Sequence, residues 1–258
     1  MNSSASAQDA PMTSQTVDGI DTKTALLHGG YHALAFGTDY ARLHFENHTR
    51  PHSFENAPVD YDGSTHYFFI QSNALGYPHF PVFLDFYRRP AAPTVIIQKY
   101  WQPTTETDRE RFVKDDEVKL EDTIFLRHEG VEGALGVTVE EAVHGEGTHL
   151  KGWKETANLG DKASAQIRLW FPECKPWRRQ VQTRDQTSSK NPILLKGFVQ
   201  HIGRSIEAYF EKNPALRSFS GEPLTSKELI ILGAVHVSAG SWQPILAYDM
   251  RKIIEGGF

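Results

Sequence analysis

The feature that most constrains this fold is one amphipathic stretch between residues 192 and 212. Its apolar side chains recur at spacings of three and four, which places them on one face of an α-helix. These side chains are Leu195, Phe198, Val199, Ile202, Ile206, Tyr209 and Phe210. Asn191 is a suitable cap, Pro192 a suitable first residue, and the pair Asn213-Pro214 a suitable end. A helix with one apolar face needs a second layer, so we expect it to pack on a sheet.

Short runs of β-branched and aromatic residues predict that sheet. Three runs with the length and composition of strands lie at 65–70, 82–87 and 94–101. Between residues 165 and 171, apolar side chains alternate with polar ones, which is the period of a half-buried strand. Residues 229–237 are continuously apolar and fit either a buried strand or a helix. The sequence therefore predicts an α+β fold, with a mainly antiparallel sheet covered by the helix at 192–212.

Composition indicates one folded unit behind a tail. Hydrophobic residues make up 39% of the chain and charged residues 23%, which is typical of a globular protein and not of a membrane protein. Residues 1–22 hold too little apolar surface to offset the entropy of ordering, so we expect a disordered tail there and a single domain over 23–258. One cysteine and no secretory leader favour an intracellular location, in cytoplasm or nucleus. A homo-oligomer is compatible with all of this.

The signatures of common enzyme classes are absent from the sequence. It contains no phosphate-binding glycine loop, no G-x-S-x-G elbow and no H-E-x-x-H motif. The single cysteine, Cys174, excludes zinc sites built from several cysteines. These absences favour a binding or regulatory protein, although they leave the question of catalysis open.

The basic segment from 175 to 212 is the main functional candidate. It carries eight basic and three acidic residues, an excess of five positive charges, in a chain whose net charge is −5. Tryptophans adjoin its arginines, and indole and guanidinium groups together can hold an anionic partner such as a nucleic acid or an acidic protein. The predicted binding residues are Trp170, Trp177, Arg178, Arg179, Arg184 and Lys190. The alternative is that these cations form surface ion pairs with the acidic run at 105–122.

A second hypothesis concerns three histidines spaced four residues apart, His44, His48 and His52. On one helix their imidazoles would share a face and could hold zinc or another divalent metal, although Pro51 disfavours a helix that continues through His52. In this alternative the protein is a metal-assisted enzyme, with His44, His48 and a nearby carboxylate activating water. His236 lies in an apolar run and is expected to be a hydrogen-bonded core residue.

Two stretches in the carboxy-terminal half carry a resemblance to known sequences. The first begins at Trp170-Phe171-Pro172-Glu173, continues through 177–185 (WRRQVQTRD) and extends over 190–205. The second is 235–246, VHVSAGSWQPIL. Together they resemble an expanded family of fungal proteins of unknown function. The resemblance implies an intracellular eukaryotic protein and brings with it no activity, cofactor or catalytic residue.

Overall fold

The structure is a computed structural model, and it describes most of the chain from residue 31 to residue 249. The described residues are 16–17, 20–21, 31–49, 59–62, 67–70, 82–85, 95–109, 120–131, 134–213, 216 and 223–249. The short strands β1 (Thr16–Val17) and β2 (Ile20–Asp21) pair with each other. The remainder of the tail expected over 1–22 lies outside the described residues.

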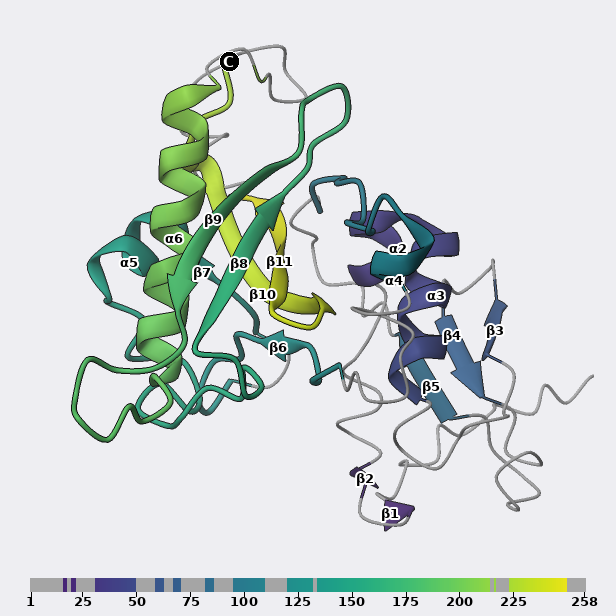
Figure 1. The fold of residues 1–258 in the computed structure, drawn as a ribbon, viewed down its shortest axis with the longest axis horizontal. Helices are drawn as coiled ribbons and strands as arrows, with labels where there is room; N and C mark the ends of the chain where they lie inside the picture. Colours follow the sequence, from purple (N-terminus) through teal and green to yellow (C-terminus); the bar gives the residue numbers. More distant parts are fainter. Residues whose placement is uncertain are drawn as a thin grey trace, which may run out of the picture.

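The largest sheet among the described residues is mixed and has six strands, and we call it the central sheet (Figure 1). Its strands are β6 (Ile124–Phe125), β7 (Val137–Thr138), β8 (Ser164–Leu169), β9 (Trp177–Gln182), β10 (Leu229–Ser238) and β11 (Ser241–Tyr248). Strand β10 pairs antiparallel with β11 on one side and with both β6 and β7 on the other. Strand β11 pairs in parallel with β8, and β8 pairs antiparallel with β9 at the edge. The continuously apolar run at 229–237 is therefore a strand.

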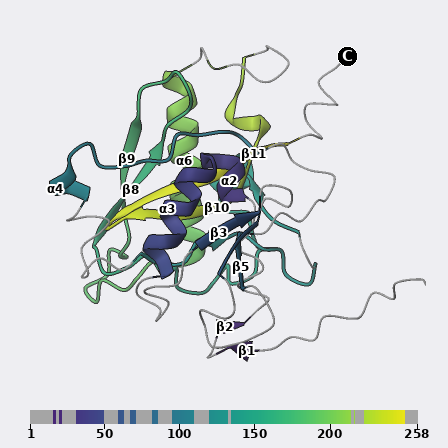
Figure 2. The same cartoon turned by 90° about the vertical axis from the view of Figure 1, so that its right-hand side faces the viewer.

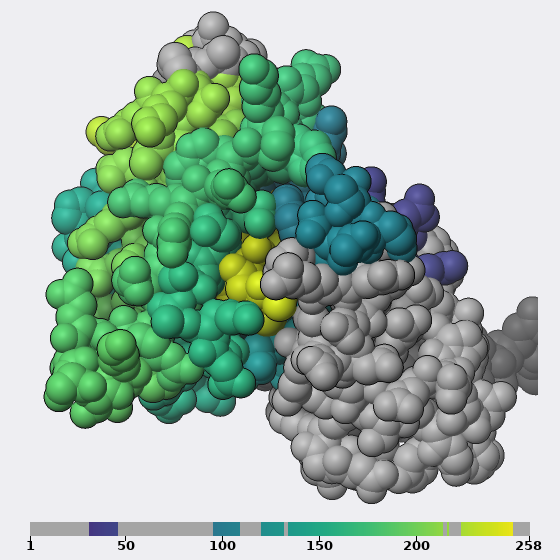
Figure 3. Space-filling view, viewed as in Figure 1, coloured from purple at the N-terminus to yellow at the C-terminus, as the bar shows by residue number. Residues whose placement is uncertain are grey.

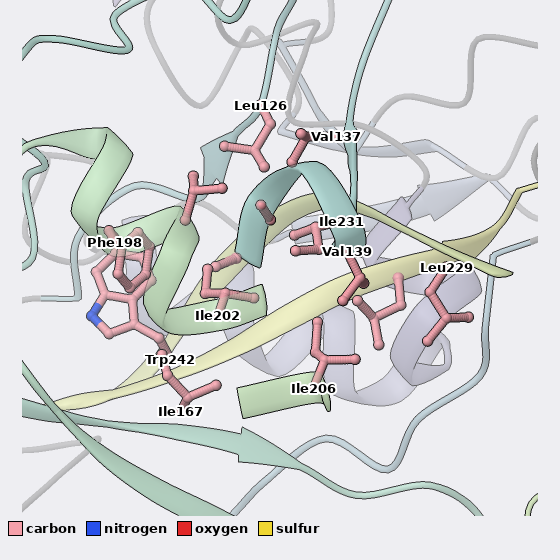
Figure 4. Packing of buried hydrophobic residues seen from close by; sticks show 14 of the residues in the cluster. Leu126, Val137, Val139, Ile167, Phe198, Ile202, Ile206, Leu229, Ile231 and Trp242 are labelled. Carbon is pink, nitrogen blue, oxygen red and sulfur yellow. The ribbon is translucent and has the colours of Figure 1, made fainter. Parts of the chain in front are cut away.

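One long helix, α6 (Leu195–Lys212), covers one face of this sheet, with α5 (Val139–His144) beside it. Figure 4 shows the resulting core, in which Phe198 and Ile202 of α6 face Trp242 and Ile167 of the sheet. The rings of Phe198 and Trp242 meet edge to face, with their centroids 5.5 Å apart. The predicted α+β fold, a mainly antiparallel sheet with an amphipathic helix packed on it, is confirmed.

The opposite face of the sheet carries a second, smaller core. Helix α2 (Tyr31–Phe36) leads into α3 (Thr38–Thr49), and both lie on the side of β10 and β11 away from α6 (Figures 1 and 2). Phe36 packs edge to face on Tyr100, with 5.5 Å between the ring centroids. The sheet is thus buried on both faces along β10 and β11.

The amino-terminal strands are placed differently from the prediction. Strands β3 (Val59–Asp62), β4 (Tyr67–Ile70) and β5 (Val82–Asp85) form a separate antiparallel sheet. The predicted strand at 94–101 is wrong as a strand, because its described residues, 95–101, contribute a single isolated bridge, at Val95, and no regular strand. In place of a ladder, this segment is held by separate backbone hydrogen bonds to different elements, such as that from the N–H of Ile96 to the carbonyl of Leu246, and by the buried side-chain amides of Gln98 and Gln243.

The predicted start of the long helix at Pro192, with the preceding residue as its cap, is also wrong. The helix begins at Leu195, and no side chain caps it. Pro192 forms an isolated β-bridge with Arg184, and the N–H of Ile193 donates to the carbonyl of Thr183 at 3.0 Å. Residues 191–193 thus pair with residues 183–185, just beyond β9, and the helix can begin only after them.

The acidic run at 105–122 is only partly described, and its described part contains the single helical turn α4 (Glu106–Arg109). Within the described ranges, no helix combines the length and the apolar character that crossing a bilayer requires.

Candidate binding surface

Alternation along β8 and β9 separates two kinds of side chain onto two faces. Ala165, Ile167 and Leu169 of β8 point toward α6 and are buried in the main core. The intervening residues of β8 are only partly buried, and they point to the opposite side. We call this opposite side of β8 and β9 the outer face.

The guanidinium of Arg168 is held in place on the outer face. Its Cζ lies 3.8 Å from the centroid of the Trp101 ring, and its Nε donates to the hydroxyl oxygen of Ser241 at 2.9 Å. Burial, and then the positive charge of Arg178, lower the pKa of Arg168 to about 10. The group is therefore still cationic at neutral pH, in a site that opposes its charge.

Arg168 and Arg178 lie directly opposite each other in the antiparallel β8–β9 pair. The N–H of Gln166 donates to Gly240 on the β11 side, so the even-numbered residues of β8 direct their backbone groups away from β9. The arginine pair is therefore a non-hydrogen-bonded pair, the kind in which opposite side chains are closest. Like charges at such a pair are destabilising. Among the described residues, no carboxylate forms an ion pair with either arginine.

A second cation and a second indole adjoin this pair. The Nζ of Lys99 lies 5.5 Å from the centroid of the Trp170 ring, and the N–H of Lys99 donates to the Trp170 carbonyl at 2.7 Å. The buried amide of Gln243 donates to the Lys99 carbonyl at 2.9 Å and accepts from the N–H of Trp101 at 3.0 Å. One glutamine of β11 thus fixes the backbone on which both Lys99 and Trp101 stand.

These residues make one basic and aromatic surface, which we call the outer-face patch. Its members are Lys99, Trp101, Arg168, Trp170 and Arg178. Lys99 and Arg178 are exposed, and the other three are half-buried. In the space-filling view, the green surface of β8 and β9 and the blue-teal surface of residues 95–108 meet on one side of the molecule, with part of the yellow β10–β11 hairpin between them (Figure 3).

The structure does not bring the six predicted binding residues together. Trp170 and Arg178 belong to the outer-face patch, but Trp177 and Arg179 point to the α6 side because adjacent residues of a strand face opposite ways. Trp177 packs edge to face on Tyr209 of α6, with 5.8 Å between centroids. Arg179 remains exposed, and its Nη1 donates to the Arg204 carbonyl at 2.8 Å.

The other two predicted residues lie beyond the far end of β9. Arg184 lines a hollow of about 220 Å³, and its Nη2 is 3.4 Å from the carbonyl oxygen of Asp161. Glu121 lines the same hollow and accepts from the Asn158 amide. Lys190 stands in the loop between β9 and α6. Arg184 and Lys190 therefore lie outside the outer-face patch, past the last residue of β9, Gln182.

The predicted metal ligands are described only in part. His44 is buried in α3, its Nδ1 lies 3.2 Å from the hydroxyl of Tyr100, and its ring stacks on that of His32 with 5.1 Å between centroids. The side chain of His48 and all of His52 lie outside the described residues. Among the side chains that are described, no group of three or more His, Cys, Asp or Glu is close enough to hold a metal ion. The contacts of His44 are those of a core residue.

His236 is placed as predicted. It is buried, accepts a hydrogen bond at Nδ1 from the N–H of Glu121 at 2.7 Å, and stacks on Trp242 with 4.5 Å between ring centroids. Its environment is that of a structural residue of the sheet.

Three members of the patch were not predicted from the sequence: Lys99, Trp101 and Arg168. Arg168 carried a usable signal, because it occupies a polar position of the alternating pattern in its strand and was therefore expected to point away from the core. Lys99 and Trp101 carried none, because only the fold brings residues 95–101 beside β8.

Comparison of the chain with protein-family models, with curated proteins and with solved structures gave no match.

Proposed function

We propose that the protein binds an anionic partner, a nucleic acid or an acidic protein, through the outer-face patch. The observation that carries this proposal is the direct opposition of Arg168 and Arg178 in a close cross-strand pair. Two guanidinium groups held together repel each other, and the fold gains nothing from that repulsion. An anion bound between the two guanidinium groups would attract both of them and so replace a net repulsion with a net attraction.

The geometry of the pair suits such an anion. Arg168 is already oriented by Trp101 and Ser241, so little conformational entropy is lost when it engages a ligand. Arg178 is exposed and able to turn toward the same ligand. Guanidinium groups bind carboxylates and phosphates through paired, charge-assisted hydrogen bonds.

The two tryptophans add an apolar component to the charged one. Trp101 and Trp170 are half-buried, so each leaves part of its indole available to a partner. Tryptophan and arginine are the residue types most enriched among those that dominate binding energy at interfaces. The patch thus combines steering by charge with contact area for an apolar side chain or a base.

The test is a pair of binding titrations on the full chain, monitored by fluorescence anisotropy. The probes are a labelled oligothymidylate and a labelled oligoglutamate, each at about 50 mM and about 300 mM salt. We expect at least one probe to bind, with an affinity that falls steeply at the higher salt. Arg178→Gln should weaken that binding about tenfold, as expected for loss of a charge-assisted hydrogen bond.

The matched control is Lys154→Gln, which removes the same charge from an exposed turn whose neighbouring residues, Trp153 and Glu155, are hydrogen-bonded to the first turn of α6. It should leave the affinity within about twofold of the wild type, because an exposed charge distant from the site is screened. Equal losses in the two variants, or binding that salt does not weaken, would contradict the proposal.

A further inference from the structure

The outer edge of β9 offers backbone groups for strand pairing. Strand β9 is the last strand of the central sheet, and among the described residues only β8 pairs with it. Two hydrogen bonds fix which groups face outward: Gln166 donates to Gly240 on the β11 side, and Thr183 donates to Ala163 on the β8 side. By alternation, Arg178, Gln180 and Gln182 direct their N–H and C=O groups to the free edge.

Positive charge flanks that edge on both faces of the sheet. Arg178 stands on the outer face, and the neighbouring Arg179 stands on the α6 face. Both are exposed, and Arg204 of α6 lies beside Arg179, whose guanidinium donates to its carbonyl. The separation of the two arginines onto opposite faces prevents one small anion from binding both. A strand lying alongside β9 would meet both, because its own side chains alternate in the same way.

We propose that β9 accepts an extended acidic segment of a partner protein as an additional edge strand. This inference rests on the proposed function and selects the acidic protein from its two partner classes. Two consecutive acidic residues of the guest would point to opposite faces, one toward Arg178 and the next toward Arg179. The guest backbone would pair with the outward N–H and C=O groups of Arg178, Gln180 and Gln182.

The two other occupants fit this edge less well. A nucleic acid has no row of alternating N–H and C=O groups, so it would leave the backbone of β9 without strand partners. A second copy pairing through its own β9 would bring together two strands that each carry two arginines and no acidic residue, and charge on an edge strand is a device that prevents self-association.

The experiment uses the full chain and a labelled peptide of about eight residues with a central Glu-Glu pair between valines and threonines. The control probe is the same peptide with N-methyl groups on alternate backbone amides. This peptide keeps the charge but lacks the N–H groups that would donate hydrogen bonds to β9. We expect the N-methylated peptide to bind about tenfold more weakly than the parent. The amide protons of Arg178, Gln180 and Gln182 should exchange more slowly when the parent peptide is bound.

Gln180→Pro tests the same edge from the side of the protein. The N–H that it removes faces outward, so the β8–β9 ladder keeps its hydrogen bonds, and proline is tolerated at such edge positions. It should weaken the parent peptide about three- to tenfold, whereas Gln180→Ala, which removes only the side chain, should not. If the proline variant fails to fold, the N-methylated peptide on the wild-type chain still decides the matter.

The outcomes separate this inference from the proposed function. Peptide binding that depends on Arg178 but not on N-methylation would retain the anion-binding patch and overturn strand addition. Tighter binding of the oligothymidylate than of the peptide, or self-association that Gln180→Pro reduces, would also overturn it. Absence of any salt-dependent binding to either anion would overturn both proposals.

Discussion

On the α6 side of β8 and β9, Ile167 and Leu169 are 0% exposed and enclosed by the helix, whereas on the outer face Arg168 stacks on an indole and opposes Arg178. The same two strands supply both faces, and neighbouring residues in the chain differ completely in what surrounds them. The α6 side is explained by burial of apolar area. The outer face is explained less fully by stability, because the contacts of Arg168 with Trp101 and Ser241 are opposed by its repulsion from Arg178.

This difference is the reason for proposing the outer face as the binding side. A side chain that fills a core has a sufficient reason for its identity, whereas two opposed arginines for which the described residues supply no carboxylate partner do not. Departures from local stability are expected at binding sites, where a ligand supplies the missing interaction. If so, stability should depend mainly on the α6 side of the sheet and binding mainly on the outer face.

The largest effect is expected on the α6 side of β8. Ile167→Ala should lower the free energy of unfolding by about 2–5 kcal/mol, because it leaves a cavity in a core that cannot collapse fully. Arg168→Met, at the adjacent position, should change it by about 1 kcal/mol, because the loss of its contact with Trp101 and of its hydrogen bond to Ser241 is partly offset by relief of the repulsion from Arg178. Urea unfolding measures both quantities. Similar losses at the two positions would show that the outer face is structural after all.

A smaller loss is expected where α6 meets α5. A Cβ added at Gly203 would lie 2.9 Å from the Cβ of Ala142 and 3.0 Å from the backbone nitrogen of Val143. Gly203→Ala should therefore destabilise the protein by about 1–2 kcal/mol, since the crowding outweighs the higher helix propensity of alanine. Thermal or urea unfolding of the purified variant measures the change.

Gly197 in the same helix supplies the matched control. An added Cβ there would come no closer than 3.6 Å to Ile193, which is ordinary contact. Gly197→Ala should stabilise the protein by about 0.5–1 kcal/mol, through propensity and a less flexible unfolded chain. Stabilisation in both variants would mean that α6 is not packed closely on α5 at Gly203.

The sequence predicted those elements in which buried residues recur at a regular spacing. Helix α6 was found because its apolar residues recur every three or four positions, and β8 because its apolar residues alternate. The edge strand β9 was not predicted, because its exposed residues are mostly polar whichever face they occupy and only Val181 is fully buried. An edge strand exposed in this way has no period that hydrophobicity can reveal.

The sequence predicted the kind of surface, basic and aromatic, but not most of the residues that form it. A basic and aromatic surface exists, but only Trp170 and Arg178 of the six proposed residues belong to it. Arg179 was wrongly grouped with Arg178 because the two are adjacent in the sequence, whereas adjacent residues of a strand point to opposite faces. Conversely, the contact of Trp101 with Arg168 spans a long stretch of chain and depends on the buried amide of Gln243. No local pattern encodes a contact of that kind.

The smallest predicted effect is a change in the pKa of His201, which lies on α6 near Arg204 and Arg179. Burial lowers the pKa of His201 below 6.5, and the charges of Arg204 and Arg179 lower it further. The folded protein therefore takes up this proton less readily than the unfolded chain does. Its contribution to stability is complete above pH 6.5 and is lost as the pH falls from 6.5 through the lower folded pKa.

Arg179→Gln should raise the pKa of His201, although burial, the largest cause, should keep it below 6.5. An NMR titration of the imidazole protons, assigned by comparison with His201→Gln, measures the change. Arg178→Gln is the control, because its side chain lies on the outer face and the sheet separates it from α6. A shift caused by the Arg178 variant and not by the Arg179 variant would contradict the assignment of the two arginines to opposite faces. Both the proposed patch and the added strand depend on that assignment.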